Sequence, residues 1–157
     1  MIQLIRTTSK NADFQNLVRL LDLELRIRDG DENHVFFAQF NKIDGLREVV
    51  VAYLNNVAVG CGAVKAYSEQ IAEIKRMFVK EEHRGRGLGG KILTELEIRA
   101  KELGFAECIL ETGFKQPEAI ALYQRSGYEI IPNYGQYAGV ESSVCMKKSL
   151  DFFGEKV

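Results

Sequence analysis

Residues 71–90 read IAEIKRMFVKEEHRGRGLGG: an apolar segment, a short basic turn and the start of a second apolar pattern. Within residues 84–90, four residues are glycine and two are arginine. Glycine lets backbone N–H groups approach a ligand without a Cβ in the way, and a helix N-terminus adds unpaired donors and partial positive charge. Arginine adds a fixed charge whose geometry suits phosphate. The stretch therefore predicts a strand, a phosphate-binding turn and a helix in succession.

Hydrophobic periodicity extends this pattern in both directions. Alternating or continuous apolar segments predict strands at 2–7, 48–54, 57–66, 71–79, 107–111, 128–131 and 142–148. A period of 3.6 predicts helices from a Thr8 or Ser9 cap to about Arg28, around 33–41, over 87–103 and over 117–125. We expect an α/β (α+β) fold, in which about four helices flank a mixed, mostly antiparallel sheet of about seven strands.

Local details sharpen this expectation. Asn55-Asn56 fits a two-residue hairpin turn, and Gly60 and Gly62 predict a bulge or a close backbone approach. On the helix over 87–103, Leu103 is expected on the apolar stripe. Glu97 and Lys101 are expected to pair at i,i+4.

Composition limits the function classes. The 157 residues suit one domain, residues 1–157, and 46% hydrophobic with 27% charged residues is ordinary for a soluble globular protein. A net charge of −1 gives no electrostatic argument for nucleic acid or an anionic membrane as a partner. No signal peptide or membrane span is expected, and three widely spaced cysteines in apolar segments suit buried, reduced thiols. We therefore expect a cytoplasmic protein.

Two motifs resemble those of one enzyme family. The spacing Arg84-x-x-Gly87-x-Gly89, entered from Met77-Phe78-Val79, resembles the acetyl-CoA-binding signature of the GNAT superfamily of N-acetyltransferases. Residues 119–128, AIALYQRSGY, look like the later A-x-x-L-Y-x-x-x-G-(F/Y) segment of that family. The order and separation of the motifs also match, and the resemblance covers roughly residues 46–148. It implies the acyl-CoA N-acyltransferase fold and a cytoplasmic transferase, an N-acetyltransferase that uses acetyl-CoA as co-substrate without a metal.

The resemblance also implies roles for individual residues. Tyr123 occupies the position of the family's general acid, and Glu73 that of the general base in some members. Spaced six residues apart on one strand, Glu73 and Val79 should share a face together with Met77. The residues expected to bind acetyl-CoA are Met77, Phe78, Val79, Arg84, Gly85, Arg86, Gly87, Leu88, Gly89, Gly90 and Gln116.

The chain departs from the family at one contact, and its acceptor side is less specific. Many members have asparagine where this chain has Gln116, so one contact to the cofactor arm is in doubt. Acidic residues in the segment 29–32 suit a cationic amine but equally suit a solvated loop. Tyr134 and Tyr137 suit a pocket wall but equally suit ordinary loop aromatics. The acceptor is expected to be a small-molecule or peptide amine, and family members are often homodimers.

Two other functions remain open from the sequence. The chain could bind acyl-CoA without catalysis, as a regulatory module. The turn also fits G-x-G-x-x-G as Gly85-x-Gly87-x-x-Gly90, with Glu111 placed as a ribose-binding acid, which is typical of NAD-dependent oxidoreductases. About eighty residues precede that pattern and only 67 follow Gly90, too few for the remainder of a dinucleotide fold and a substrate domain. No cysteine has a histidine partner near Glu73 or Tyr123, so direct transfer without a covalent enzyme intermediate is expected.

Overall fold

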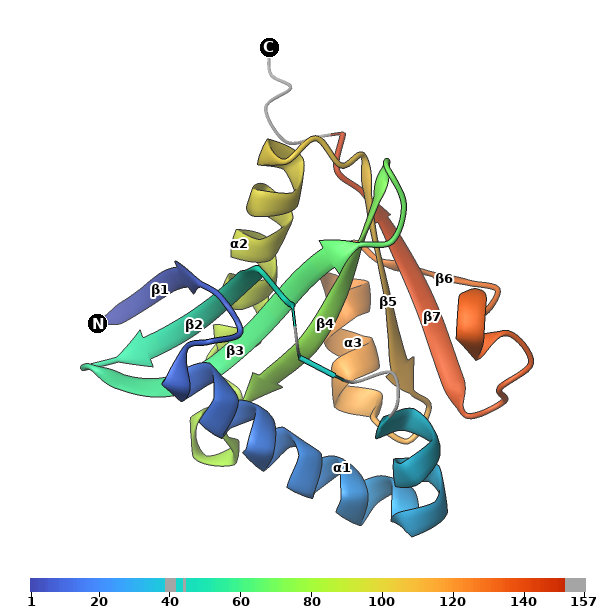
Figure 1. Ribbon diagram of the computed structural model, residues 1–157, viewed down its shortest axis with the longest axis horizontal. Helices are drawn as coiled ribbons and strands as arrows, with labels where there is room; N and C mark the ends of the chain where they lie inside the picture. Colours follow the sequence, from blue (N-terminus) through green and yellow to red (C-terminus); the bar gives the residue numbers. More distant parts are fainter. Residues whose placement is uncertain (39–41, 44, 152–157) are drawn as a thin grey trace. The chain divides into compact units, whose positions relative to one another are not determined.

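The computed structural model describes residues 1–38, 42–43 and 45–151, without the side chains of Asp29 and of 31–38. The described residues form seven strands, which are labelled in Figure 1: β1 (Ile2–Thr7), β2 (Glu48–Leu54), β3 (Val57–Ala66), β4 (Ile71–Val79), β5 (Glu107–Gly113), β6 (Glu129–Ile131) and β7 (Ser143–Ser149). The α-helices are α1 (Ala12–Ala38), α2 (Leu88–Glu102) and α3 (Pro117–Arg125). Two 3₁₀ turns, η1 (Glu81–His83) and η2 (Gly135–Tyr137), complete the described elements.

The strands form one seven-stranded sheet in the order β1-β2-β3-β4-β5-β7-β6. β4 runs parallel to β5, whereas β1–β2, β2–β3, β5–β7 and β6–β7 pair antiparallel. This confirms the predicted fold class. In the described residues the α-helices number three instead of four, because the two expected N-terminal helices join in α1. Gly30 kinks α1 at φ 82° and ψ 165°, values that glycine adopts readily; residues 39–41 of the expected second helix lie outside the described residues.

The chain divides into two compact units. Unit 1 contains residues 1–65 and 75–96, and unit 2 contains residues 66–74 and 97–157. Each unit has its own part of the predicted chemistry: the glycine-rich turn belongs to unit 1, and Glu73 and Tyr123 belong to unit 2.

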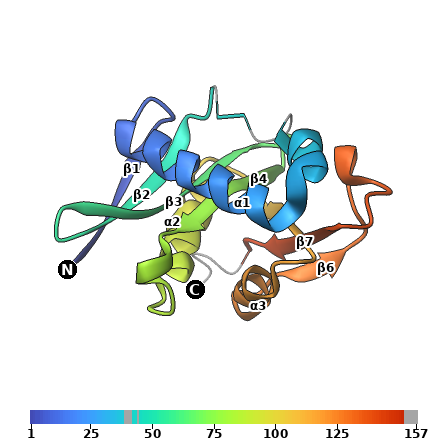
Figure 2. The same ribbon diagram turned by 90° about the horizontal axis from the view of Figure 1, so that it is seen from below.

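In unit 1, α1 lies along strands of the sheet, as Figures 1 and 2 show, and its buried apolar residues pack against them. The buried residues of this core come from α1, β2, β3 and the end of β4, and include Phe14, Leu17, Val49, Cys61 and Phe78. The helix begins differently from the sequence prediction. Asn11 caps it, since its Oδ1 accepts a hydrogen bond from the Phe14 N–H at 2.8 Å.

The hairpin between β2 and β3 turns as the sequence predicts. Asn55 and Asn56 both have positive φ, 50° and 70°, and the register shifts between Ala52 and Tyr53. Gly60 and Gly62 of β3 allow the predicted close approach. A Cβ built on Gly60 would lie 2.9 Å from the Phe78 carbonyl oxygen, and one on Gly62 would lie 2.6 Å from the Met77 sulfur.

Strand β4 contains an irregularity that the sequence did not reveal. Arg76, inside the strand, has φ 57°, whereas extended backbone requires a negative φ. Side chains alternate between faces only along regular extended backbone. The expectation that Glu73 shares a face with Met77 and Val79 is therefore wrong, because it carried the two-residue period across Arg76.

Unit 2 has a core that includes a buried ion pair. Glu97 of α2 is 1% exposed, and its carboxylate accepts hydrogen bonds from Tyr128 Oη at 2.8 Å and from Lys148 Nζ at 2.9 Å. The carboxylate of Glu97 binds Tyr128 and Lys148 and not the predicted partner Lys101. The expectation for Leu103 is wrong, since this residue is 43% exposed.

Candidate functional site

The glycine-rich turn of unit 1 joins β4 to α2 through η1. Gly85 and Gly87 have φ of 79° and 80°, a conformation that other residues rarely adopt. Residues 84–87 of the turn are exposed and Gly89 and Gly90 are half-buried, whereas Leu88 is buried and anchors the start of α2. A Cβ built on Gly90 would meet no atom within 4 Å, so packing does not require glycine there. This open space lies at a helix N-terminus, where a phosphate group can approach unpaired backbone N–H groups.

The two arginines of the turn differ in their surroundings. Arg84 Nε donates to the Val79 carbonyl oxygen at 2.8 Å, and an Arg84 terminal nitrogen donates to Glu24 Oε1 of α1 at 2.6 Å. The guanidinium also lies 5.6 Å from the centre of the Phe78 ring. Arg84 thus ties the turn to α1 and to the end of β4, whereas Arg86 is exposed beside the turn.

The last three residues of β4, Met77, Phe78 and Val79, have separate environments in unit 1. Phe78 is buried in the α1 core, while Met77 lies against Gly62 and near Ile92 and Leu96 of α2. The Val79 carbonyl already accepts from Arg84. These side chains have packing roles, so any cofactor contact in this segment falls to the remaining backbone groups.

In unit 2, the structure joins Glu73 to a tyrosine that the sequence placed in another role. Glu73 is 3% exposed, and its Oε2 accepts a hydrogen bond from Tyr134 Oη at 2.8 Å. Burial, and next the negative charge of Glu73, raise the pKa of Tyr134 far above that of an ordinary phenol. Tyr134 therefore remains a protonated donor to the carboxylate.

Tyr123 lies on α3, which starts at Pro117 and ends before Gly127. Its side chain is buried and meets the Tyr128 ring edge-on at 5.9 Å between ring centres. Burial, and next the charge of Glu111, raise the pKa of Tyr123. Its hydroxyl can therefore donate a hydrogen bond, but it gives up its proton less readily than a free phenol.

Two other sequence candidates also belong to unit 2. Gln116 is half-buried at the N-cap of α3, and its side-chain nitrogen lies 3.4 Å from a Cβ built on Gly113. Glu111 accepts a hydrogen bond from Ser143 Oγ at 2.7 Å. The acidic candidates at 29–32 have no described side chains.

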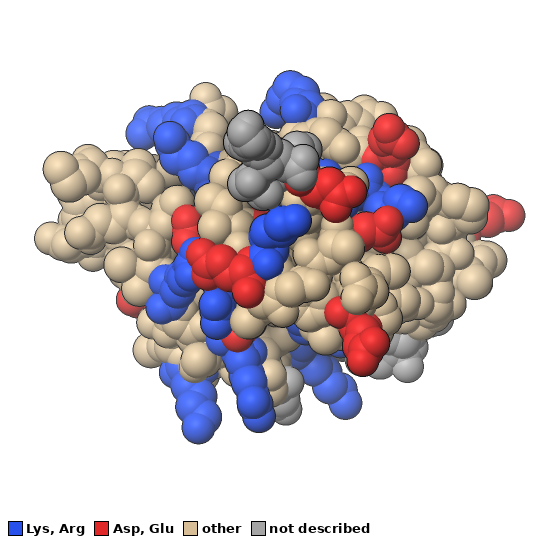
Figure 3. Space-filling view, turned by 90° about the horizontal axis from the view of Figure 1, so that it is seen from above, with Lys and Arg blue, Asp and Glu red and all other residues tan. Residues whose placement is uncertain are grey.

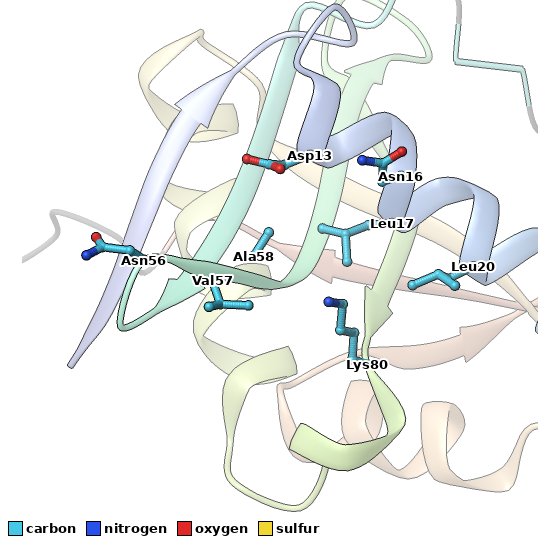
Figure 4. Close-up of a pocket in the computed structure, with 8 residues that line it drawn as sticks. All are labelled: Asp13, Asn16, Leu17, Leu20, Asn56, Val57, Ala58 and Lys80. Atoms are coloured by element: carbon cyan, nitrogen blue, oxygen red, sulfur yellow. The ribbon is translucent and has the colours of Figure 1, made fainter.

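Unit 1 also contains a hollow of about 320 Å³ that holds none of the predicted site residues. Figure 4 shows the residues around it, which come from α1, the β2–β3 hairpin and the segment after β4. They are Asp13, Asn16, Leu17, Leu20, Asn56, Val57, Ala58 and Lys80. Asp13 accepts a hydrogen bond from Tyr53 at 2.7 Å, and this contact joins α1 to β2.

Surface charges of both signs lie close together on the face drawn in Figure 3. Within the described residues, no helix is long and apolar enough to cross a membrane. In that part of the chain, no group of three or more His, Cys, Asp or Glu side chains is placed to hold a metal ion.

Sequence reasoning missed two features. The positive φ of Arg76 could not be predicted from the sequence, because arginine rarely adopts this conformation. The contact between Glu73 and Tyr134 joins residues 61 positions apart, and only the presence of two tyrosines near glycines pointed to that loop.

Comparison with known proteins shows the family and supports the fold. The chain matches the Acetyltransferase (GNAT) family over residues 14–128. It is 33% identical over 150 residues to an IAA acetyltransferase from Azospirillum brasilense, covering 92% of this chain and 97% of the relative. A Klebsiella pneumoniae structure described as an acyl-CoA N-acyltransferase has a TM-score of 0.79 at 30% identity, covering 96% of this chain and 98% of that one.

A second structure, from Elizabethkingia anophelis, shows the same fold at 19% identity with a TM-score of 0.66, covering 94% of this chain and 97% of the other. It is a GNAT family acetyltransferase with acetyl-CoA bound. The mostly antiparallel sheet also differs from the parallel sheet of a dinucleotide fold, which removes the basis of the oxidoreductase alternative. The chain belongs to the GNAT family of N-acetyltransferases and is an acyltransferase.

Proposed function

We propose that the chain transfers an acetyl group from acetyl-CoA directly to a primary amine, and that residues 1–157 act as one catalytic domain. The observation that carries the proposal is the exposed turn at the start of α2, with the open space beside Gly90. Acetyl-CoA supplies an activated acetyl thioester and carries phosphate groups. The chain must therefore bind phosphate, place the thioester beside an amine and control two protons.

Residues 84–90 hold the pyrophosphate in this proposal. Gly85 and Gly87 set the backbone path, and the first N–H groups of α2 are oriented toward the anion. Arg86 adds positive charge from an exposed position. Arg84 contributes by fixing the turn, because its guanidinium is already bound to Glu24 and to the Val79 carbonyl.

Backbone groups of Met77, Phe78 and Val79 are assigned to the cofactor arm, together with the side-chain amide of Gln116. The positive φ at Arg76 supports the backbone assignment, because bulges redirect the groups that follow them and are frequent beside active sites. Gln116 carries the same functional group as the asparagine of many relatives.

Tyr123 stabilises the departing thiolate. Its raised pKa means that it acts first as a hydrogen-bond donor to the sulfur, and completes proton transfer only as negative charge develops there. A free thiol has a pKa near 8.5, well below that of a phenol, so full transfer in advance of bond cleavage is unfavourable.

Glu73 receives a proton from the amine. A protonated amine with a pKa near 10.4 must lose two protons on becoming an amide. One of them replaces the proton that Tyr123 gives to the thiolate, and the other leaves to solvent. Glu73 is already buried as a hydrogen-bond acceptor, which suits a base kept apart from bulk water. No step uses a metal ion. The three buried, unpaired cysteines support a cytoplasmic location.

The test measures CoA thiol release from acetyl-CoA with a panel of propylamine, free amino acids, a lysine peptide, a peptide with a free N-terminus, and IAA. The panel includes IAA because of the Azospirillum relative's name. We expect one amine at least to release CoA and to gain an acetyl group by mass. Acetyl-CoA binding without release from any acceptor would instead favour the non-catalytic acyl-CoA-binding module.

The variant Tyr123→Phe tests the assigned acid. Transfer should slow by roughly 10²-fold or more, since the loss of an acid–base group removes a contribution of that order. The KM for acetyl-CoA should change little. An unchanged rate would remove Tyr123 from the mechanism.

A further inference from the structure

Tyr134 covers the carboxylate that the proposed function uses as base. Glu73 is 3% exposed, whereas Tyr134 is only partly buried, and its hydroxyl donates to Glu73 Oε2 at 2.8 Å. An amine that approaches Oε2 of Glu73 meets this hydroxyl first, so it must displace the hydroxyl or pass its proton through it. The cost of breaking a hydrogen bond to a buried carboxylate opposes the first route.

The surroundings hold Tyr134 in place. Its ring meets Tyr67 edge-on at 5.2 Å and Tyr137 edge-on at 5.6 Å between ring centres. The loop that carries it is closed by Asn133, whose side-chain nitrogen donates to the Val140 and Ser143 carbonyls at 2.9 and 3.1 Å. A hydroxyl fixed by two ring contacts and a closed loop is placed before any substrate arrives.

We infer that Tyr134 is a catalytic residue that carries the proton from the acceptor amine to Glu73. The amine nitrogen gives its proton to the Tyr134 oxygen as the Tyr134 hydroxyl proton moves to Glu73 Oε2. The O–H bond of Tyr134 is thus broken on one side and remade on the other. Glu73 becomes a neutral acid and Tyr134 remains a neutral phenol. The inference rests on the proposed function, because it assumes that Glu73 is the base.

The groups around Tyr134 favour this concerted transfer. The ones that act on its hydroxyl are the carboxylate of Glu73, the thiol of Cys145 on β7 and the hydroxyl of Tyr137 on η2. Glu111 of β5 acts in turn on Tyr137, and burial raises the pKa of Cys145. Burial and the neighbouring carboxylate of Glu73 make a tyrosinate at position 134 unfavourable. The hydroxyl must therefore gain a proton as it loses one.

The matched experiment compares Tyr134→Phe with Tyr67→Phe. Both variants remove one hydroxyl from the same group of rings, and Tyr134 is the ring whose hydroxyl donates to Glu73 Oε2. With propylamine as acceptor and saturating acetyl-CoA, we expect the kcat/KM of Tyr134→Phe at pH 7 to fall by roughly 10²-fold or more. The loss should shrink as the pH approaches the pKa of the amine near 10.4, where the amine no longer needs a base.

Tyr67→Phe should keep the wild-type pH profile, and Glu73→Gln should reproduce the profile of Tyr134→Phe. A purely structural role for Tyr134 would instead lower the rate by the same factor at every pH. That result, or a wild-type profile in Tyr134→Phe while Glu73→Gln loses activity, would overturn the relay but retain Glu73 as the base.

A second measurement needs no acceptor. The carbon-13 NMR signal of the Glu73 carboxylate at neutral pH should shift in Tyr134→Phe and stay in place in Tyr67→Phe. An unmoved signal in Tyr134→Phe would overturn the inference whatever the kinetics show. Failure of the proposed function gives a different result: no acceptor in the panel releases CoA, while the NMR signal still responds to Tyr134→Phe.

Discussion

The buried pair between Lys148 and Glu97 gives a prediction whose size follows from the structure. The charged atoms lie 2.9 Å apart, and the side chains are 9% and 1% exposed. Removing one partner of such a pair costs about 3–5 kcal/mol, because the remaining charge is buried without compensation. A chain of this length loses roughly 2–4 °C in Tm per kcal/mol. Lys148→Met should therefore lower the Tm by roughly 6–20 °C.

Calorimetry at neutral pH measures this loss, and two further variants test its cause. Lys148→Met combined with Glu97→Gln should recover much of the Tm, because a neutral amide needs no cation and can still accept from Tyr128. Arg99→Ala removes an exposed pair with Glu102 at 3.3 Å and should shift the Tm by about 2 °C or less.

The single variant and the double variant are compared at the same neutral pH, so that the carboxylate of Glu97 is the difference that is measured. A loss below about 3 °C, or a double variant less stable than Lys148→Met, would refute the account of a dry, mutually dependent pair.

Two further predictions concern packing and thiol burial. In urea unfolding, Gly60→Ala should lose more stability than Gly62→Ala. The new Cβ at position 60 would meet the Phe78 carbonyl oxygen at 2.9 Å, whereas the nearest atoms at position 62 belong to side chains, which can move. Equal losses would contradict this reasoning. Burial raises the pKa of Cys61 and of Cys108 from 9.0 to about 12, so the unfolded chain loses these protons first and stability should fall from about pH 9 to 12, by about 1.4 kcal/mol per pH unit for each thiol. Urea unfolding should show a shallower decline in Cys61→Ala than in the wild type, and an identical slope would refute the burial effect.

The sequence predicted those features that depend on neighbouring residues. The strands, the hairpin at Asn55-Asn56 and the strand–turn–helix around Gly87 all follow from local periodicity and from glycine or asparagine at positive φ. The family motifs then led to the roles proposed for the turn and for Tyr123.

Features set by distant contacts were not predictable in this way. The residues around Glu97 are those of an exposed helix position. Its burial is favourable because Lys148, 51 residues later in the chain, pairs with its carboxylate. A regular two-residue period places Glu73 on the face of Val79. The positive φ of Arg76 interrupts that period, and it depends on the surroundings of the strand and not on its sequence. The sequence offered no partner for Tyr134, because the loop after β6 is what places its hydroxyl beside Glu73.

The central claim, that residues 84–90 bind the phosphates of acetyl-CoA, is tested most directly at Gly90. A Cβ built there has open space around it, so the side chain of Gly90→Val should extend into the space assigned to the ligand. Calorimetric titration with acetyl-CoA should give a Kd at least tenfold weaker than that of the wild type, a loss of about 1.4 kcal/mol or more, while the Tm without ligand stays within about 2 °C. Wild-type affinity in Gly90→Val would contradict the claim.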